Sequence, residues 1–195
     1  MIKIGVLISG GGSNLQSIID ACESGILKGK AQVSVVISNR ADAFGLERAK
    51  KKGIPAEFID RKKHADAMSF CAAIKNELEK HNVELLCLAG FLSKLEPNLV
   101  KSFKIVNIHP ALFPKYGGKG MYGHHVHEAV VKAGEKESGA TVHWVDEHYD
   151  HGNIILQEKV AVLAGDTPEA LAARVLKVEH KIYPEAILKV ISSKL

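Results

Sequence analysis

Short apolar runs alternate with amphipathic segments along the first 109 residues. The apolar runs cover residues 2–9, 33–38, 56–59, 85–89 and 105–109. Runs of this length, bounded by glycine or polar residues, are typical of strands buried on both faces of a parallel sheet. The intervening segments have the apolar spacing and end signals of helices, predicted over 13–24, 43–52, 65–81 and 97–102. The alternation predicts an α/β fold with an open, mostly parallel twisted sheet and flanking helices.

The pattern changes after Pro110. The next segment, 111–123, is rich in glycine and proline and is predicted to be a loop. We expect a helix over 126–133, an antiparallel hairpin with strands 140–146 and 154–162, and a last helix capped by Thr167 with Pro168 in its first turn. We therefore expect one domain over 1–195, made of an α/β half, 1–110, and a second half, 111–195, of loop, hairpin and C-terminal helix.

Composition narrows the class of protein. Hydrophobic residues make up 46% of the chain and charged residues 25%, which is typical of a globular protein and excludes disorder for most of it. No apolar run is long enough to span a membrane, and the first eight residues are too short for a signal peptide. Three cysteines without close spacing predict reduced thiols in the cytoplasm. A net charge of +4 without a large basic cluster favours a small anionic substrate over nucleic acid.

A glycine loop follows the first predicted strand. Gly10, Gly11 and Gly12 precede Ser13 and Asn14, either of which is expected to cap the first helix. Backbone N–H groups at a helix N-terminus bind anions, so we expect a phosphate here. The third glycine of a dinucleotide-binding fingerprint and the lysine of a P-loop are missing, which favours a phosphate monoester. The alternative is a tight turn that only permits close packing of strand and helix.

The fifth predicted strand ends in a pair of polar residues. Asn107 and His109 are two positions apart, so both point to one face of the strand, and Pro110 ends it. Ligands of parallel sheets bind at this carboxyl edge. An amide and an imidazole side by side can stabilise an oxyanion and exchange a proton near neutral pH. The alternatives are a loop-end hydrogen bond for Asn107 and a buried structural role for His109.

Asp150 and several histidines lie in the predicted loops. A carboxylate near His109 would hold the imidazole in its charged form, but Asp150 by itself is also an ordinary turn residue. The histidines raise the question of a metal site; they are His124, His125, His127, His148 and His151. No cysteine or carboxylate has a matching spacing, so we expect surface histidines and no metal.

Several motifs together resemble the phosphoribosylglycinamide formyltransferases, a folate-dependent family of purine synthesis. The matching stretches are VLISGGGSNL (6–15), SNRADAFGL (38–46), LAGF (88–91), NIHPALFPKY (107–116), GATVH (139–143), DHG (150–152), GDT (165–167) and EHKIYP (179–184). They follow one another over nearly the whole chain. The resemblance implies a formyltransferase-type fold with a Rossmann-like N-terminal half.

The resemblance also implies residue roles. Glycinamide ribonucleotide would place its phosphate on Gly12, Ser13 and Asn14 and its ribose hydroxyls on Glu179. Asn107, His109 and Asp150 would be catalytic. The folate-binding residues would be Lys63, Phe91, Leu92, Ser93, Lys94, Leu95, Asn107, Val142 and Asp150. Of these, Lys63 would lie near the glutamate tail of the folate. The segment 117–122 resembles a short insertion that would reshape the mouth of the site.

The activity implied is direct transfer of the formyl group of 10-formyltetrahydrofolate to the amine of glycinamide ribonucleotide, without a metal, in a monomer or weak homodimer. Formyltetrahydrofolate hydrolase and methionyl-tRNA formyltransferase use similar motifs but carry an extra N-terminal or C-terminal domain, for which we expect no room here. A nucleotide-binding module without catalysis is the remaining alternative. It has no use for Asn107 and His109 on one face.

Overall fold

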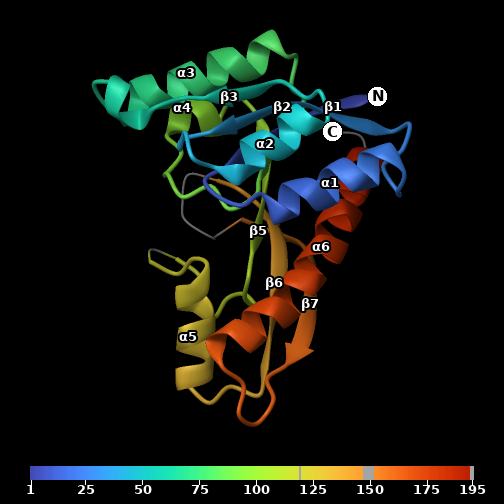
Figure 1. The fold of residues 1–195 in the computed structure, drawn as a ribbon, viewed down its shortest axis with the longest axis vertical. Helices are drawn as coiled ribbons and strands as arrows, with labels where there is room; N and C mark the ends of the chain where they lie inside the picture. The colour runs from blue at the N-terminus through green and yellow to red at the C-terminus, as the bar shows by residue number, and fades with distance from the viewer. Residues whose placement is uncertain (119, 147–151, 194–195) are drawn as a thin grey trace.

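A computed structural model describes residues 1–118, 120–146 and 152–193 (Figure 1). Its strands are β1 (Ile2–Ile8), β2 (Ala31–Ser38), β3 (Ala56–Phe58), β4 (Leu85–Leu88), β5 (Lys104–His109), β6 (Glu137–Trp144) and β7 (Ile154–Ala161). Its helices are α1 (Ser13–Glu23), α2 (Phe44–Lys51), a 3-10 turn η1 (Arg61–Lys63), α3 (Ala67–Lys80), α4 (Pro97–Val100), α5 (His124–Lys132) and α6 (Pro168–Ser192). None of the helices in these described residues is both long and apolar enough to cross a membrane.

The described strands form one sheet in the order β3-β2-β1-β4-β5-β6-β7. The five strands from β3 to β5 run parallel, whereas β6 and β7 are antiparallel to their neighbours. The predicted fold class is therefore confirmed, including the antiparallel hairpin. Parallel β1, β4 and β5 place their carboxyl ends at one edge, where β1 leads to the glycine loop and β5 ends at His109.

Element boundaries differ from the prediction where side chains or strand pairing decide them. Helix α3 begins at Ala67 rather than at residue 65, because the Asp66 side chain accepts a hydrogen bond from the backbone N–H of Ser69 and caps the helix. Strand β6 begins at Glu137 rather than at residue 140, because its pairing with β7 continues to Ala161. Turn-like residues in β6 hid this extension from the sequence pattern.

Alternate side chains of the central strands enter two separate hydrophobic clusters. On one face, Ile4 and Val6 of β1 and Val106 and Ile108 of β5 pack with helices α1, α2 and α6. On the other face, Leu7 of β1 and the neighbouring strand residues pack with α3 and α4. Because Asn107 and His109 alternate with Val106 and Ile108, they belong to the second face. The polar pair therefore lies on the same side of the sheet as α3, but outside the hydrophobic cluster that α3 covers.

Tyr183 anchors the long helix α6 to the centre of the sheet. Its side chain is fully buried, and its hydroxyl lies 2.8 Å from the carbonyl oxygen of Leu88 and 3.1 Å from that of Val106. Burial raises the pKa of Tyr183, so the hydroxyl keeps its proton and donates it. One side chain thus ties α6 to the end of β4 and to the middle of β5, the strand that carries Asn107 and His109.

We expect Tyr183→Phe to lower the free energy of unfolding by about 1–3 kcal/mol, because it removes the only proton donor contributed by this side chain and leaves buried carbonyl groups underbonded. Urea denaturation followed by circular dichroism measures this change. The control is Tyr122→Phe, which removes the hydroxyl from a half-exposed side chain. Equal unfolding midpoints for the two variants would contradict the anchoring role.

Candidate active site

The glycine loop joins β1 to α1 in a conformation that requires glycine. Gly12 occupies the cap position of α1 with φ 69°, so the prediction that Ser13 or Asn14 caps this helix is wrong. Both are instead in its first turn. A Cβ on Gly12 would lie 2.7 Å from the Cα of Gly45 in α2, so the loop lies against the second helix. The first N–H groups of α1 lack partners within the helix, which is the arrangement that the predicted anion site requires.

A buried polar pair joins this loop to α6. The Asn14 amide donates a hydrogen bond of 2.6 Å to the Glu179 carboxylate, and each residue is only 8% exposed. Burial raises the pKa of Glu179, while the bond from Asn14 opposes that shift. Among the described residues, nothing contacts the Asn14 Oδ1 atom at hydrogen-bond distance. Buried polar atoms are normally satisfied, so an unpartnered acceptor beside an anion site fits a bound ligand.

One cationic side chain that the sequence did not single out contacts the loop. Arg48 of α2 donates to the carbonyl oxygen of Gly11 at 2.8 Å and to the side chain of Gln16 at 3.3 Å. Burial and the charge of Arg48 lower the pKa of His180 in α6. The buried His180 Nε2 atom also lacks a hydrogen-bond partner among the described residues. The surroundings of the loop therefore supply positive charge as well as N–H donors.

Asn107 is held by a histidine on the neighbouring antiparallel strand. Asn107 and His143 are register partners in β5 and β6, and the Asn107 Nδ2 atom lies 3.1 Å from the His143 Nε2 atom. The His143 Nδ1 atom lies 2.8 Å from the carbonyl oxygen of Trp144, which can only accept a hydrogen bond. Nδ1 therefore carries the proton and Nε2 accepts one from the Asn107 amide. This contact fixes the orientation of the amide and leaves its second N–H to serve the site.

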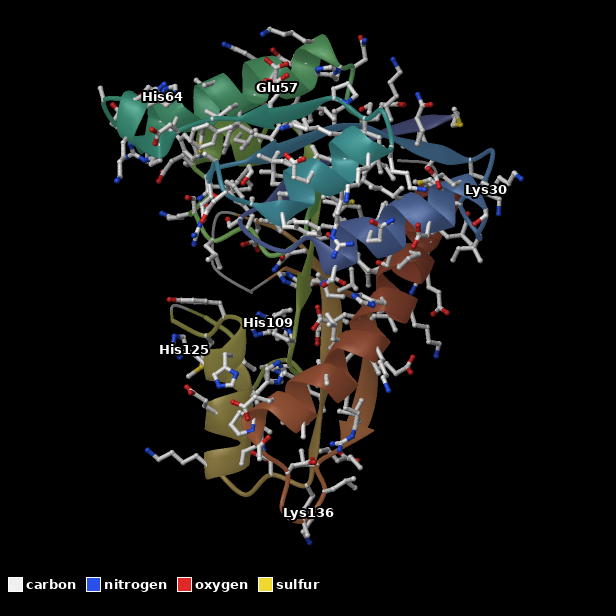
Figure 2. All side chains as sticks on the ribbon, viewed as in Figure 1. Lys30, Glu57, His64, His109, His125 and Lys136 are labelled. Atoms are coloured by element: carbon white, nitrogen blue, oxygen red, sulfur yellow. The ribbon has the colours of Figure 1, made fainter. Side chains whose placement is uncertain are left out.

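His109 is buried, with 5% of its surface exposed, and is held on two sides. Its Nε2 atom lies 2.7 Å from the carbonyl oxygen of Tyr116. The Phe113 ring contacts both histidines, with its centroid 5.1 Å from that of His109 and 4.8 Å from that of His143. Figure 2 shows His109 in the interior of the molecule, between β5 and α5, whereas the labelled Lys30 and Lys136 lie at its outline.

A cavity of about 610 Å³ opens beside these side chains. Its lining residues are Leu88, Gly90, Phe91, Leu92, Ser93, Lys94, Leu95, Asn107, Ile108, His109, Pro110, Gly118, Gly120, Met121, Tyr122, Gly123, His143, Val145 and Asp146. Most of this surface is apolar, with polar groups gathered around Asn107 and His109. A largely apolar cavity with a few convergent polar groups is the usual form of a small-molecule site.

The cavity includes most of the residues predicted for folate, with two exceptions. Phe91, Leu92, Ser93, Lys94, Leu95 and Asn107 line it. Val142 does not: its side chain is fully buried in the core on the opposite face of β6, because His143, the next residue, occupies the cavity face. Lys63 is exposed in η1 and is not part of the lining. Asp150 lies outside the described residues.

Hydrogen bonds between strand ends tie the cavity to the glycine loop. The Ser9 hydroxyl donates to Asn39 at 2.7 Å and accepts from the backbone N–H of Leu92 at 2.9 Å. The Asn39 amide in turn donates to the hydroxyl of Ser93 at 2.8 Å. The loop after β4, which forms one cavity wall, is thereby fixed to the end of β1. The anion site and the apolar cavity are two parts of one site.

The structure also reveals cavity residues that the sequence analysis did not predict. His143, Tyr116 and Met121 line or support the cavity, but only strand register and loop packing reveal them. The expected insertion, 117–122, contributes Gly118, Gly120, Met121 and Tyr122 to the cavity wall. Within 1–118, 120–146 and 152–193, no three histidine, cysteine, aspartate or glutamate side chains are grouped as a metal site. The three cysteines are unpaired thiols.

Known proteins provide an independent comparison. The family model of the formyl transferases matches residues 2–187. The phosphoribosylglycinamide formyltransferase of Haemophilus influenzae is 44% identical over 189 residues, which cover 96% of this chain and 86% of that protein. The crystal structure of glycinamide ribonucleotide transformylase 1 from Symbiobacterium toebii superposes with a TM-score of 0.90 at 44% identity, covering 96% of this chain and 86% of that one.

Other relatives are longer than this chain. The chloroplastic phosphoribosylglycinamide formyltransferase of Arabidopsis thaliana is 43% identical over 95% of this chain, which spans 64% of that protein. The trifunctional purine biosynthetic protein adenosine-3 of Chironomus tentans is 46% identical over 97% of this chain, which spans 14% of it. The match in each case covers nearly all of this chain, including the glycine loop and both halves of the site. The chain belongs to the formyl transferase family and, within it, to the phosphoribosylglycinamide formyltransferases, one-carbon transferases of purine biosynthesis.

Proposed function

We propose that this chain transfers the formyl group of 10-formyltetrahydrofolate to the amine of glycinamide ribonucleotide by direct attack. The observation that carries the proposal is the convergence of Asn107 and His109 at one end of a largely apolar cavity that is fixed to an anion-binding loop. A transferase needs both parts, because its two substrates are an anionic ribonucleotide and a largely planar pterin. Family membership supports the same assignment.

The ribonucleotide would bind across the glycine loop and α6. Its phosphate would accept hydrogen bonds from the backbone N–H groups of Gly12, Ser13 and Asn14 at the positive end of α1. Its ribose hydroxyls would donate to Glu179, whose carboxylate already accepts one hydrogen bond from Asn14. The unpartnered Oδ1 of Asn14 gives the ligand a further acceptor. This placement directs the amine of the substrate toward the carboxyl end of β5.

The folate would occupy the apolar cavity, with its pterin beside the loop 90–95. Main-chain groups of that loop would recognise the polar edge of the pterin, while Phe91 and Val145 contribute apolar surface. We keep Lys63 as the predicted partner of the glutamate tail and Asp150 as part of the folate loop. The proposed partners are these two small molecules, bound by a monomer or weak homodimer without a metal.

The chemistry follows from the two side chains at the end of β5. The substrate amine attacks the formyl carbon, a new C–N bond forms, and the electron pair of the carbonyl moves to its oxygen. The amide N–H of Asn107 and protonated His109 would stabilise this oxyanion. A proton then passes from the attacking nitrogen to N10 of the folate, through a water molecule that we assign to Asp150. The C–N10 bond breaks and the formyl group stays on the ribonucleotide.

The first experiment is an assay of formyl transfer. The protein is mixed with 10-formyltetrahydrofolate, or a stable deaza analogue, and glycinamide ribonucleotide, and the absorbance of the deformylated folate is followed. We expect release of this product to depend on the ribonucleotide. Release without the ribonucleotide would instead indicate a hydrolase. No release under either condition, with binding of a nucleotide retained, would indicate a binding module.

Glu179→Gln tests the ribose site. Glutamine keeps the shape of the side chain and can still accept the bond from Asn14, but it loses the charge and one acceptor oxygen. We expect KM for the ribonucleotide to rise by about 10- to 100-fold with little change in kcat, because a hydrogen bond to a charged group is lost. Steady-state kinetics at saturating folate measure this change.

The matched control is Glu158→Gln. It removes an exposed carboxylate of β7 that pairs with Lys181 of α6, the helix that also carries Glu179. This variant should keep the KM of the unmodified protein. An unchanged KM in Glu179→Gln would remove Glu179 from the ribose site.

A further inference from the structure

We propose that Glu135, acting through Tyr116, is a positioning residue that holds the imidazole of His109 in one tautomer. The inference rests on the proposed function, in which the protonated imidazole of His109 stabilises the oxyanion. Neither Glu135 nor Tyr116 lines the cavity, and Glu135 lies in the connection between α5 and β6. Two hydrogen bonds nevertheless connect the three residues from the surface to the site, one made by the backbone carbonyl of Tyr116 and the other by its hydroxyl.

The hydrogen bond between His109 and Tyr116 decides which ring nitrogen gains or loses a proton. The Nε2 atom of His109 lies 2.7 Å from the carbonyl oxygen of Tyr116. A carbonyl oxygen only accepts hydrogen bonds, so Nε2 must carry a hydrogen in both the neutral and the charged ring. The proton that His109 gains or loses is therefore the one on Nδ1. Without the carbonyl, the neutral ring could carry its hydrogen on either nitrogen.

The carbonyl of Tyr116 reaches this place through an unusual backbone conformation. Tyr116 has φ 56°, in the left-handed region that residues other than glycine rarely adopt. The conformation costs about 1 kcal/mol, so surrounding contacts must hold it. Two glycines, Gly117 and Gly118, follow Tyr116, so no side chain restrains the backbone immediately after it. The side chain of Tyr116 and the residues before it therefore add to the restraint that the backbone hydrogen bond from Met121 to Gly118 gives this loop.

The hydrogen bonds that Tyr116 and Lys115 make to Glu135 supply this restraint. The Tyr116 hydroxyl donates to the Glu135 Oε1 atom at 3.0 Å, and the Lys115 ammonium donates to the same oxygen at 2.9 Å. The bond from Lys115 and then that from Tyr116 lower the pKa of Glu135, so it is ionised at neutral pH. Burial and the neighbouring Glu135 raise the pKa of Tyr116, so the hydroxyl remains a donor. Lys115 and Tyr116, two consecutive loop residues, thus both donate hydrogen bonds to the Glu135 carboxylate.

Tyr116→Phe separates this role from the others, because it removes the hydroxyl and keeps the ring and the backbone carbonyl. We expect kcat to fall by about three- to tenfold, as for loss of one ordinary hydrogen bond, with KM for both substrates within about twofold. Nitrogen NMR of ring-labelled histidine should show neutral His109 as the Nε2–H tautomer in the unmodified protein and as a mixture in the variant. A purely structural role of Tyr116 would lower the unfolding midpoint without changing the tautomer.

A second set of variants keeps the inference testable if Tyr116→Phe folds poorly. Glu135→Ala should reproduce the loss in kcat, while Glu135→Gln, which can still accept from the Tyr116 hydroxyl, should recover part of it. The matched control is Glu137→Gln, an exposed carboxylate two residues away that pairs with Lys159 instead. It should leave kcat and the tautomer unchanged.

The outcomes distinguish this inference from the proposed function. Activity retained by a His109→Asn variant would contradict the role of His109 itself. An inactive His109→Asn variant together with unchanged kcat or an unchanged tautomer in Tyr116→Phe and Glu135→Ala would overturn the positioning role alone.

Discussion

We expect His109→Ala to lower kcat for formyl transfer by about 10²- to 10³-fold, because the variant lacks the protonated imidazole that would stabilise the oxyanion. His109 lines the cavity beside Asn107, and only 5% of its surface is exposed. Water cannot replace it easily at this depth. Since the ribonucleotide phosphate and the pterin would bind elsewhere, the dissociation constants of both substrates should change little.

Two measurements check this expectation. Single-turnover kinetics give the rate of the chemical step, and isothermal titration calorimetry with the ribonucleotide and with a stable folate analogue gives binding. Replacement of His81, a surface histidine paired with Glu77 on α3, is the control for loss of an imidazole. If His109→Ala retains more than about a tenth of the activity, His109 does not stabilise the oxyanion of the reaction.

We expect Asn107→Ala to lower kcat by about 100- to 1,000-fold, the effect typical of removing one oxyanion donor. The structure gives a reason for this strength: His143 accepts one N–H of the amide, so the amide is oriented before substrate binds. A donor held in place pays no reorganisation cost in the transition state. The ribonucleotide KM should stay within about threefold, because the interaction forms only as the oxyanion develops.

His143 provides an internal comparison for this effect. His143→Ala leaves Asn107 in place but removes the acceptor that orients it, so we expect a smaller loss in kcat than in Asn107→Ala. The double variant should lose little more than Asn107→Ala alone, because both side chains act through the same N–H donor. Strictly multiplicative losses in kcat would show that His143 acts on the reaction independently of Asn107.

The site uses main-chain carbonyl oxygens to set both histidines. The carbonyl of Trp144 fixes the hydrogen of His143 on Nδ1, and that of Tyr116 fixes a hydrogen of His109 on Nε2. The other ring nitrogen is thus Nε2 in His143 and Nδ1 in His109, although both rings contact the same Phe113 ring. Backbone carbonyls suit this task because they accept hydrogen bonds and do not titrate.

Local patterns in the sequence determined the elements and part of the site. Apolar runs and helix signals predicted every strand and α-helix that the structure describes, with errors mainly at the ends, but not the short 3-10 turn η1. The pairing of Asn107 with His109 on one face follows from the two-residue period of a strand, which does not depend on distant residues. The anion site at the glycine loop follows equally from local geometry, although the residue at the cap is Gly12 rather than Ser13 or Asn14.

Only the tertiary structure decided the contacts between distant segments. The bond from Asn14 to Glu179 joins residues 165 positions apart, and that from Asn107 to His143 joins residues 36 apart. The register of β5 with β6 places His143 in the cavity and Val142 in the core, whereas the resemblance implied a folate contact for Val142. A shift of one residue in that register would exchange the two side chains, and no local pattern determines it, because register is set by how whole strands pack.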